Sequence, residues 1–230
     1  MAAPGRAAFL EVCILATSNE TSTGSTEVVV VDILIIDGHP NLDSFCAALV
    51  SRYARGARQA GATVEVLALR SLSFDVILHQ GYQAKQALEP DLLRAQAMIK
   101  ASGHVVVVTP VWWGSMPALL KGFLDRTMER GWAFRYGSNG LPEGLLAGRS
   151  ARLIVSTDSP LWYLRWIQGD PTVRSLVRST LKFCGFKPVA LTRIGPVHGS
   201  SDRKREEWLT KAAQAGQSDA SRVRHSSSRD

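Results

Sequence analysis

HVVVVTPVWWGSMP, residues 104–117, is the stretch that decides the fold. Its continuous apolar run predicts a buried parallel strand, and the two prolines that follow stiffen the loop after it. A helical pattern begins at Ala118. Trp112 and Trp113 are costly to expose unless they cover something flat and apolar, such as a ring-shaped cofactor. The alternative is that both indoles plug the core.

The length and composition fit one domain with a sizeable core. The chain has 230 residues, of which 45% are hydrophobic and 20% charged. We expect a poorly ordered extension at 1–27, which leaves open whether those residues belong to the native protein. The domain should span 28–213. The last segment, 214–230, is rich in Ser, Arg and Asp, so we expect disorder there.

Several classes of protein are disfavoured by the composition. No stretch is apolar for long enough to cross a bilayer, and residues 7–14, the nearest match to a signal peptide, are interrupted by Glu11. A cytoplasmic protein is therefore expected. Three widely spaced cysteines suggest neither a disulfide framework nor a zinc site. The net charge of +7 is scattered without interleaved aromatics, which argues against nucleic-acid binding.

Strand-like and helix-like segments alternate along the chain, as in a parallel sheet covered by helices on both faces. The expected strands are 31–37, 63–67, 104–109, 151–156 and 188–194, and the expected helices are 44–59, 90–101, 118–130, 172–184 and 202–213. Ser44 or Asp43 should cap the first helix. Five such strands suit a doubly wound α/β sandwich of order 2-1-3-4-5. Ligands then bind where the loops after strands 1, 3 and 4 meet.

The loop after the first strand, residues 38–45, reads GHPNLDSF and opens a helix. Free backbone N–H groups and the positive end of the helix dipole predict a phosphate site there. His39 and Ser44 can add neutral donors. The alternative is a capped helix with a surface histidine. The chain lacks the glycine-rich motifs of dinucleotide and P-loop sites.

Several motifs recur in one order: GHP and SF at 38–45, PVWW at 110–113, MPALLKGF at 116–123, GWAF at 131–134 and FCGF at 183–186. Together they resemble the flavodoxin-like NAD(P)H dehydrogenase (quinone) family, which includes diaphorase-type quinone reductases and flavoproteins that regulate glutathione-gated potassium efflux. The similarity covers about 31–213.

The resemblance implies a bound flavin, FMN or FAD, that takes hydride from NAD(P)H and passes it to a quinone with ping-pong kinetics. It also implies a homodimer. The residues expected to bind the flavin are His39, Asn41, Ser44, Phe45, Cys46, Pro110, Val111, Trp112, Trp113, Gly114, Thr157 and Asp158. Cys46 lies in the first helical turn, where the helix dipole can lower the pKa of a thiol. The alternative is that Cys46 is a small buried hydrophobic residue.

The third loop departs from the family pattern. It reads STDSP at 156–160, where well-known members have two threonines and two glycines. An ionised Asp158 beside the reduced flavin would oppose its negative charge. Spacing places Gln168 where the diaphorases have a histidine. Tyr163 and Gln168 are thus the candidate catalytic residues, with Tyr163 or water supplying protons. The alternative is that Trp162, Tyr163 and Trp166 only pack the loop.

Two other functions stay open at this point. The altered third loop also suits a regulatory flavoprotein that docks on a membrane transporter, as in the potassium-efflux branch. A flavodoxin-type electron carrier without catalysis is the third candidate. The sequence leaves FMN or FAD, NADH or NADPH, and the natural acceptor undecided.

Overall fold

A computed structural model describes residues 31–227, and its centre is a parallel sheet of order β2-β1-β3-β6-β7. The predicted order 2-1-3-4-5 is confirmed, because β6 and β7 are the fourth and fifth predicted strands. The apolar runs explain the burial: β3 has seven buried residues in succession from His104 to Pro110. The strands are β1 (Val31–Asp37), β2 (Val64–Ala68), β3 (Ser102–Pro110), β6 (Ser150–Ser156) and β7 (Val189–Ile194).

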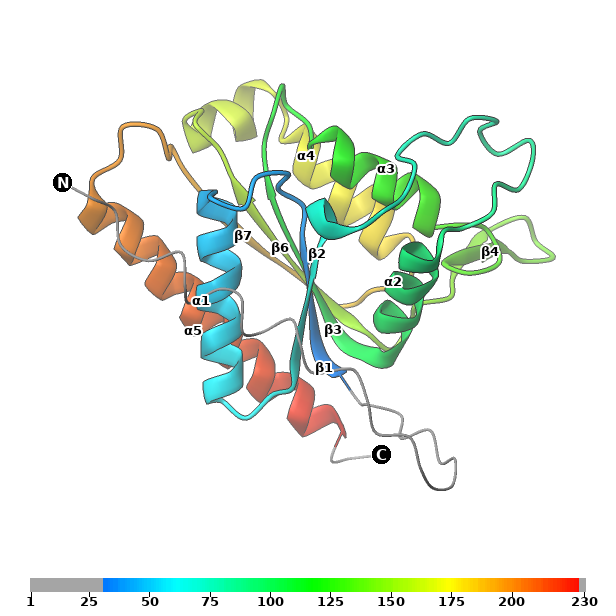
Figure 1. Cartoon of the computed structure of the whole chain (residues 1–230), viewed down its shortest axis with the longest axis horizontal. Coiled ribbons are helices and arrows are strands. Elements are labelled where there is room, and N and C mark those ends of the chain that lie inside the picture. The colour runs from blue at the N-terminus through cyan, green and yellow to red at the C-terminus, as the bar shows by residue number, and fades with distance from the viewer. Residues whose placement is uncertain (1–30, 228–230) are drawn as a thin grey trace.

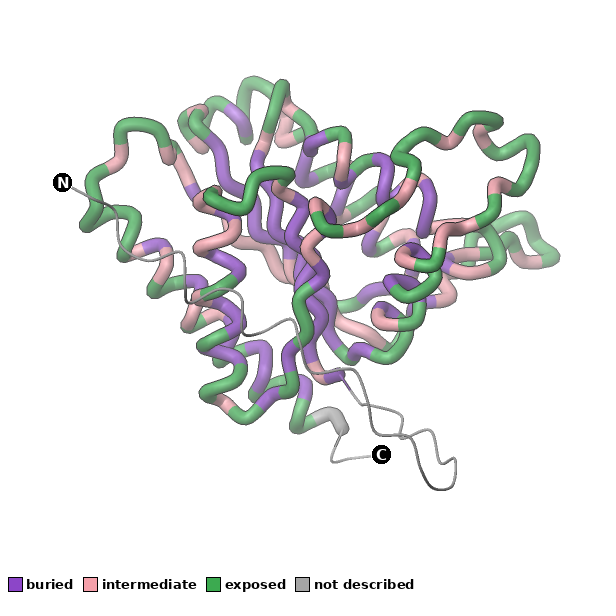
Figure 2. Tube along the Cα trace, viewed as in Figure 1, coloured by how far each residue is buried: buried purple, intermediate pink, exposed green. Residues whose placement is uncertain are grey.

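Helices cover both faces of the sheet, as Figure 1 shows. One face carries α1 (Phe45–Gln59) and α5 (Asp202–Ser227). The other carries α2 (Pro90–Ala101), α3 (Ala118–Thr127), α4 (Pro171–Val173) and the π-helical η3 (Arg174–Lys182). Figure 2 shows buried residues along the strands and inner helix faces, and exposed residues outside. The predicted three-layer sandwich is therefore confirmed.

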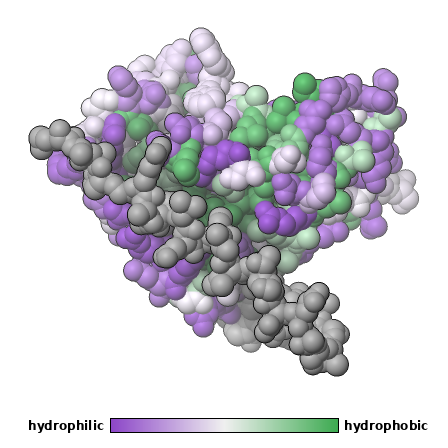
Figure 3. Space-filling view, in the orientation of Figure 1, coloured by the Kyte–Doolittle hydropathy of each residue, from purple (hydrophilic) through white to green (hydrophobic). Residues whose placement is uncertain are grey.

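Two connections depart from a simple strand and helix alternation. The segment 131–148 contains a short hairpin of β4 (Phe134–Tyr136) and β5 (Pro142–Gly144), which the sequence analysis did not predict. After β2, the 3-10 helix η1 (Leu69–Ser71) leads into 72–89, which crosses α3. Figure 3 shows hydrophobic residues near the middle of this face and hydrophilic residues toward its edges.

A fully buried cation holds the 72–89 segment to α3. The Arg126 guanidinium donates to the carbonyls of Asp75 and Ala87, at 2.6 and 2.8 Å. It also pairs with the Glu89 carboxylate at 2.8 Å. A buried charge must be paired to be tolerated, and here the pairing fixes both ends of a segment without regular structure.

The predicted disorder of residues 214–230 is wrong up to Ser227, because α5 continues to that residue. Its C-terminal half packs closely on α1, where a side chain at Gly216 would collide with the Tyr53 carbonyl. Ala220 and Val223 are buried, and so is Asp219. This half of α5 therefore packs through small residues and one paired carboxylate, where most helices pack through large apolar side chains. The predicted N-terminal extension, 1–27, lies outside the described residues.

Candidate functional site

Three loops meet at the carboxyl edge of the sheet, at the top of Figure 1. They follow β1, β3 and β6, the three strands after which the ligand-binding loops were predicted. Backbone hydrogen bonds tie the first two loops to the neighbouring strands: Gly38 N–H donates to the Val108 carbonyl of β3 at 2.9 Å, and Val111 N–H donates to the Ser156 carbonyl at the end of β6 at 2.7 Å. The predicted meeting of these loops is therefore present in the structure.

The first loop forms an anion cradle at the start of α1. Ser44 caps the helix, and its hydroxyl accepts the Ala47 N–H at 3.1 Å while keeping its own proton free to donate. Within residues 31–227, no acceptor meets the N–H groups of Phe45 and Cys46. Together with the helix dipole, they favour a phosphate group.

His39 lies in the same loop and can act as a neutral donor. Burial lowers the pKa of its ring, and this outweighs the opposite effect of nearby Asp37. The Asn41 N–H donates to Nδ1 at 2.9 Å, so the neutral ring carries its proton on Nε2. The Asn41 side chain accepts from Asp43 N–H and stays within the loop. His39 also lies edge-on to Trp112, with ring centroids 5.5 Å apart, which joins the first loop to the second.

Two further groups lie near the anion cradle, the Cys46 thiol and the ion pair of Asp37 with Arg70. Cys46 is buried with its thiol 3.2 Å from the Ser156 hydroxyl, and burial raises its pKa to about 12. It is therefore a small buried residue and no reactive thiolate. Asp37, at the end of β1, is buried and pairs with Arg70 at 2.6 Å. Arg70, which sequence reasoning missed, neutralises a carboxylate next to the anion cradle.

The second loop makes a tight turn over residues 112–115. Trp112 and Ser115 exchange two backbone hydrogen bonds of 2.8 Å, and the residues between them, Trp113 and Gly114, both have positive φ, at 52° and 70°. Such a backbone suits Gly114 but costs Trp113 about 1–2 kcal/mol. In the part of the chain that the structure describes, the N–H groups of Trp113 and Gly114 have no acceptor.

Both indoles of this loop face outward. Trp113 is fully exposed and Trp112 is 43% exposed. The alternative that they plug the core is therefore wrong. Pro110 and Val111 carry the turn away from β3. An exposed tryptophan held in a strained backbone, beside two unpaired donors, fits a surface for a planar polar ring.

The turn is held from behind by the start of the next helix. The hydroxyl of Thr172, which is 2% exposed, donates to the Gly114 carbonyl at 2.8 Å. A Cβ on Gly114 would lie 3.5 Å from Pro171 and 3.7 Å from the Gln168 side-chain oxygen. The structure thus brings predicted Gln168 next to predicted Gly114. Thr172 was not among the predicted residues.

The carboxylate of the third loop has a backbone donor of its own. Asp158 accepts the His198 N–H at 2.8 Å, in the segment after β7. Thr157 is buried, and its backbone bonds to Ile194 and Val197. The His198 N–H partly offsets the negative charge of Asp158, so the predicted repulsion between this carboxylate and a reduced flavin ring is weaker. A role of Thr157 and Asp158 in flavin binding stays a prediction.

The aromatic segment after this loop is exposed. It includes the π-helical η2 (Tyr163–Ile167). Trp162 and Trp166 are 62% and 72% exposed, so the alternative that they pack the loop is wrong for both. Tyr163 lies edge-on to Trp162 and is partly exposed. Tyr163 is close enough to the surface to serve a substrate, but its catalytic role stays a prediction.

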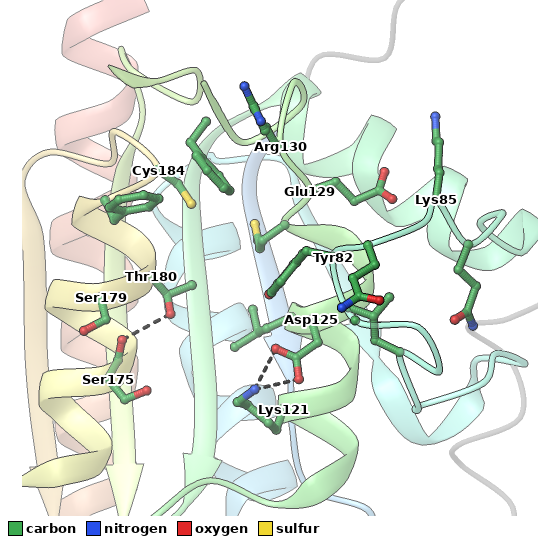
Figure 4. Close-up of a pocket in the computed structure, with 18 of the residues that line it drawn as sticks. Tyr82, Lys85, Lys121, Asp125, Glu129, Arg130, Ser175, Ser179, Thr180 and Cys184 are labelled. Atoms are coloured by element: carbon green, nitrogen blue, oxygen red, sulfur yellow. Dashed lines mark hydrogen bonds and ion pairs between the residues drawn. The ribbon is translucent and has the colours of Figure 1, made fainter. Parts of the chain in front are cut away.

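A cavity of about 740 Å³ lies beside these loops, between α3, η3 and the segment around Tyr82. Figure 4 shows its polar side chains: Lys121 and Asp125 are paired on one wall, and Ser175, Ser179 and Thr180 line the other. Met116, which closes the second loop, also lines it. The cavity therefore borders the residue that follows the turn, while residues 112–115 do not line it.

The described residues fit a flavin. The anion cradle presents two unpaired N–H groups, a free hydroxyl and a neutral histidine to a phosphate. The turn at 112–115 presents two further N–H groups and an exposed indole to the polar edge and face of a ring. These are the two kinds of contact that a flavin phosphate and its isoalloxazine need.

A model of the flavodoxin-like fold family matches residues 32–218. Because this match spans most of the chain, the protein belongs to that family, and the resemblance inferred from the loop motifs is confirmed. None of the helices within residues 31–227 is both long and apolar enough to cross a bilayer.

Similar proteins carry related names. An uncharacterized NAD(P)H oxidoreductase of Haemophilus influenzae is 29% identical over 189 residues, which cover 80% of this chain and 93% of that protein. The ribosyldihydronicotinamide dehydrogenase (quinone) of Mus musculus is 28% identical and covers 79% and 89%. The solved structure of an NAD(P)H:quinone oxidoreductase from Methanothermobacter marburgensis has a TM-score of 0.70, with 26% identity, and covers 81% and 96%.

Proposed function

We propose that this protein is a flavin-dependent NAD(P)H oxidoreductase that transfers a hydride from NAD(P)H to a quinone or a similar small acceptor. The observation that carries the proposal is the pair of neighbouring loops, each with two unpaired backbone N–H groups, at the switch point of the sheet. The names of the relatives support the same activity.

The first loop would bind the flavin phosphate, and the second would contact the flavin ring. His39, Ser44 and the N–H groups of Phe45 and Cys46 would hold the phosphate. A bound flavin accepts two electrons with a hydride and gains negative charge on its pyrimidine edge. The N–H groups of Trp113 and Gly114 are the donors that can stabilise such charge, since they are held in place before it develops.

The substrate side would be formed by exposed groups around the turn. Trp113, Trp162 and Trp166 offer open aromatic surface to a planar donor or acceptor. Gln168 beside Gly114 can orient a carbonyl through its amide but cannot release a proton. Proton supply to a reduced quinone would then come from Tyr163 or water.

Purified protein should be yellow and show the visible absorption bands of an oxidised flavin. Chromatography of the released cofactor then decides between FMN and FAD, because both share the phosphate and ring that these loops would hold. Addition of NAD(P)H without oxygen should bleach the bands, and a quinone should restore them. A colourless protein that takes up neither FMN nor FAD would overturn the proposal.

We further propose that two copies associate, as the family resemblance implies. Exposed large side chains around the cavity support this: Tyr82 is 82% exposed and Tyr136 51%. An interface over this face would bury them and enclose the cavity next to the turn. Light scattering should give twice the 25.0 kDa of one chain. A single-chain mass at micromolar concentration would contradict association.

A further inference from the structure

The turn at 112–115 has one side-chain hydrogen bond to its backbone that comes from a distant helix. It runs from the Thr172 hydroxyl to the Gly114 carbonyl, over 2.8 Å. We propose that Thr172 is a positioning residue that fixes the Trp113 and Gly114 N–H groups for the flavin ring, an inference that rests on the proposed function. Thr172 itself is buried and needs no contact with the flavin.

Thr172 is well placed for this role because it is anchored to the sheet. Asp170, two residues earlier, has a φ of 55° and pairs with Arg193 on β7, whose Nε donates to it at 2.9 Å. The Asp170 carbonyl accepts the Arg174 N–H at 2.9 Å and so starts the helix that carries Thr172. The hydroxyl therefore reaches the turn from a rigid support.

The turn needs such a support, because its own geometry is strained. Trp113 and Gly114 both have positive φ, which an unrestrained chain with tryptophan at this position would rarely keep. If the Gly114 carbonyl loses its donor, the peptide planes of the turn can rotate. The two N–H groups then point in several directions, and flavin binding must first order them.

The hydrogen bond should also influence the reduction potential. The N–H groups of the turn stabilise a negatively charged reduced ring more than an oxidised one. Loss of their alignment should therefore weaken binding of the reduced form more strongly. The potential of the bound flavin should become more negative, since the oxidised form is then relatively favoured.

The test is Thr172→Val, which keeps the shape and removes the hydroxyl. We expect the Kd for oxidised flavin to rise about tenfold, which corresponds to about 1.4 kcal/mol, the usual contribution of one hydrogen bond. The potential should become more negative by roughly 15 to 30 mV, where about 30 mV corresponds to a further tenfold loss for the reduced form. Thr172→Ser keeps the hydroxyl, so its flavin Kd and its reduction potential should both lie close to the wild-type values.

Thr127→Val is the matched control. Thr127 is buried in α3, and its hydroxyl donates to the Phe123 carbonyl at 2.6 Å, away from the turn. It should lower the melting temperature without changing the Kd or the potential. If Thr172→Val does not fold, Thr172→Ala carries the test.

Two results would overturn the inference: wild-type flavin affinity and potential in the folded Thr172 variants, or equal losses in Thr172→Ser and Thr172→Val. Failure of the wild-type protein to bind flavin would instead reject the proposed function.

Discussion

Replacement of Asp219 by alanine should lower the free energy of unfolding by about 3–5 kcal/mol, the usual effect of breaking a buried ion pair. Asp219 is buried and lies in the half of α5 that joins the helix to the sheet. Its carboxylate accepts hydrogen bonds from Arg152 at 2.5 and 2.9 Å and from the Tyr53 hydroxyl at 2.7 Å. His104 on β3 lies 3.3 Å away.

Removal of the carboxylate takes hydrogen-bond partners from Arg152 and Tyr53. The Arg152 guanidinium loses its two hydrogen bonds to Asp219 and keeps the one to the Thr192 hydroxyl, at 3.0 Å. Tyr53, which is fully buried on α1, loses the acceptor of its hydroxyl. Since an uncompensated buried cation is costly, the cost exceeds that of the lost contacts alone. Urea unfolding followed by circular dichroism measures the change.

Glu207→Gln is the control, because Glu207 on the same helix pairs with Lys204 at the surface. It should change stability by less than about 1 kcal/mol. Flavin affinity should survive Asp219→Ala wherever the variant is folded, since Asp219 contacts the amino-terminal parts of β3 and β6, away from the three loops. A loss below about 1 kcal/mol for Asp219→Ala would contradict the role of the pair.

The contribution of Asp219 should depend on pH in one direction. Burial alone raises the pKa of its carboxyl, but hydrogen bonds from Arg152 and His104 outweigh this and hold the pKa well below its usual range. A depressed pKa in the folded state adds stability above the unfolded pKa of about 4, and that stability is lost as pH falls toward the folded pKa. The difference in unfolding free energy between wild type and Asp219→Ala should therefore be smaller below about pH 4 than at about pH 5.

Asp219 also shows where sequence reasoning about the fold stops. The strands were predictable because runs such as 104–108 are apolar and end at loops with prolines or glycines. The hairpin of β4 and β5 was missed because strands of three residues carry no visible alternation. The end of α5 was missed because its composition resembles disorder, while its anchor, Asp219, depends on Arg152, 67 positions earlier.

Some parts of the candidate site were likewise predictable from the sequence, and others were not. The anion cradle was predictable because a helix start after a strand supplies free N–H groups whatever its sequence. The orientation of Asp158 was not predictable, because its donor, His198, lies beyond the next strand. Thr172 and Arg70 were missed for a similar reason: each acts on a residue 58 or 33 positions away, and no local pattern marks such contacts.

Replacement of Ser44 by aspartate should weaken flavin binding by at least about a hundredfold. Aspartate is as good a helix cap as serine, so α1 should keep its start. Its carboxylate, however, would stand where the cradle receives a phosphate. Two unit charges 4 Å apart repel by about 4 kcal/mol at the effective dielectric of a protein surface, and each 1.4 kcal/mol is tenfold in affinity. Fluorescence titration of the flavin-free protein measures the Kd.

Ser44→Asn separates charge from capping, because asparagine caps a helix equally well and carries no charge. Its Kd should rise by no more than about tenfold, from loss of the hydroxyl donor. Both variants should melt within a few degrees of wild type without flavin, which shows that the helix start is intact. The difference in flavin Kd between Ser44→Asp and Ser44→Asn should become smaller in high salt, because screening weakens the charge repulsion at this partly exposed position. Equal affinities in low salt would mean that no phosphate lies at Ser44, and the anion cradle would then need another ligand.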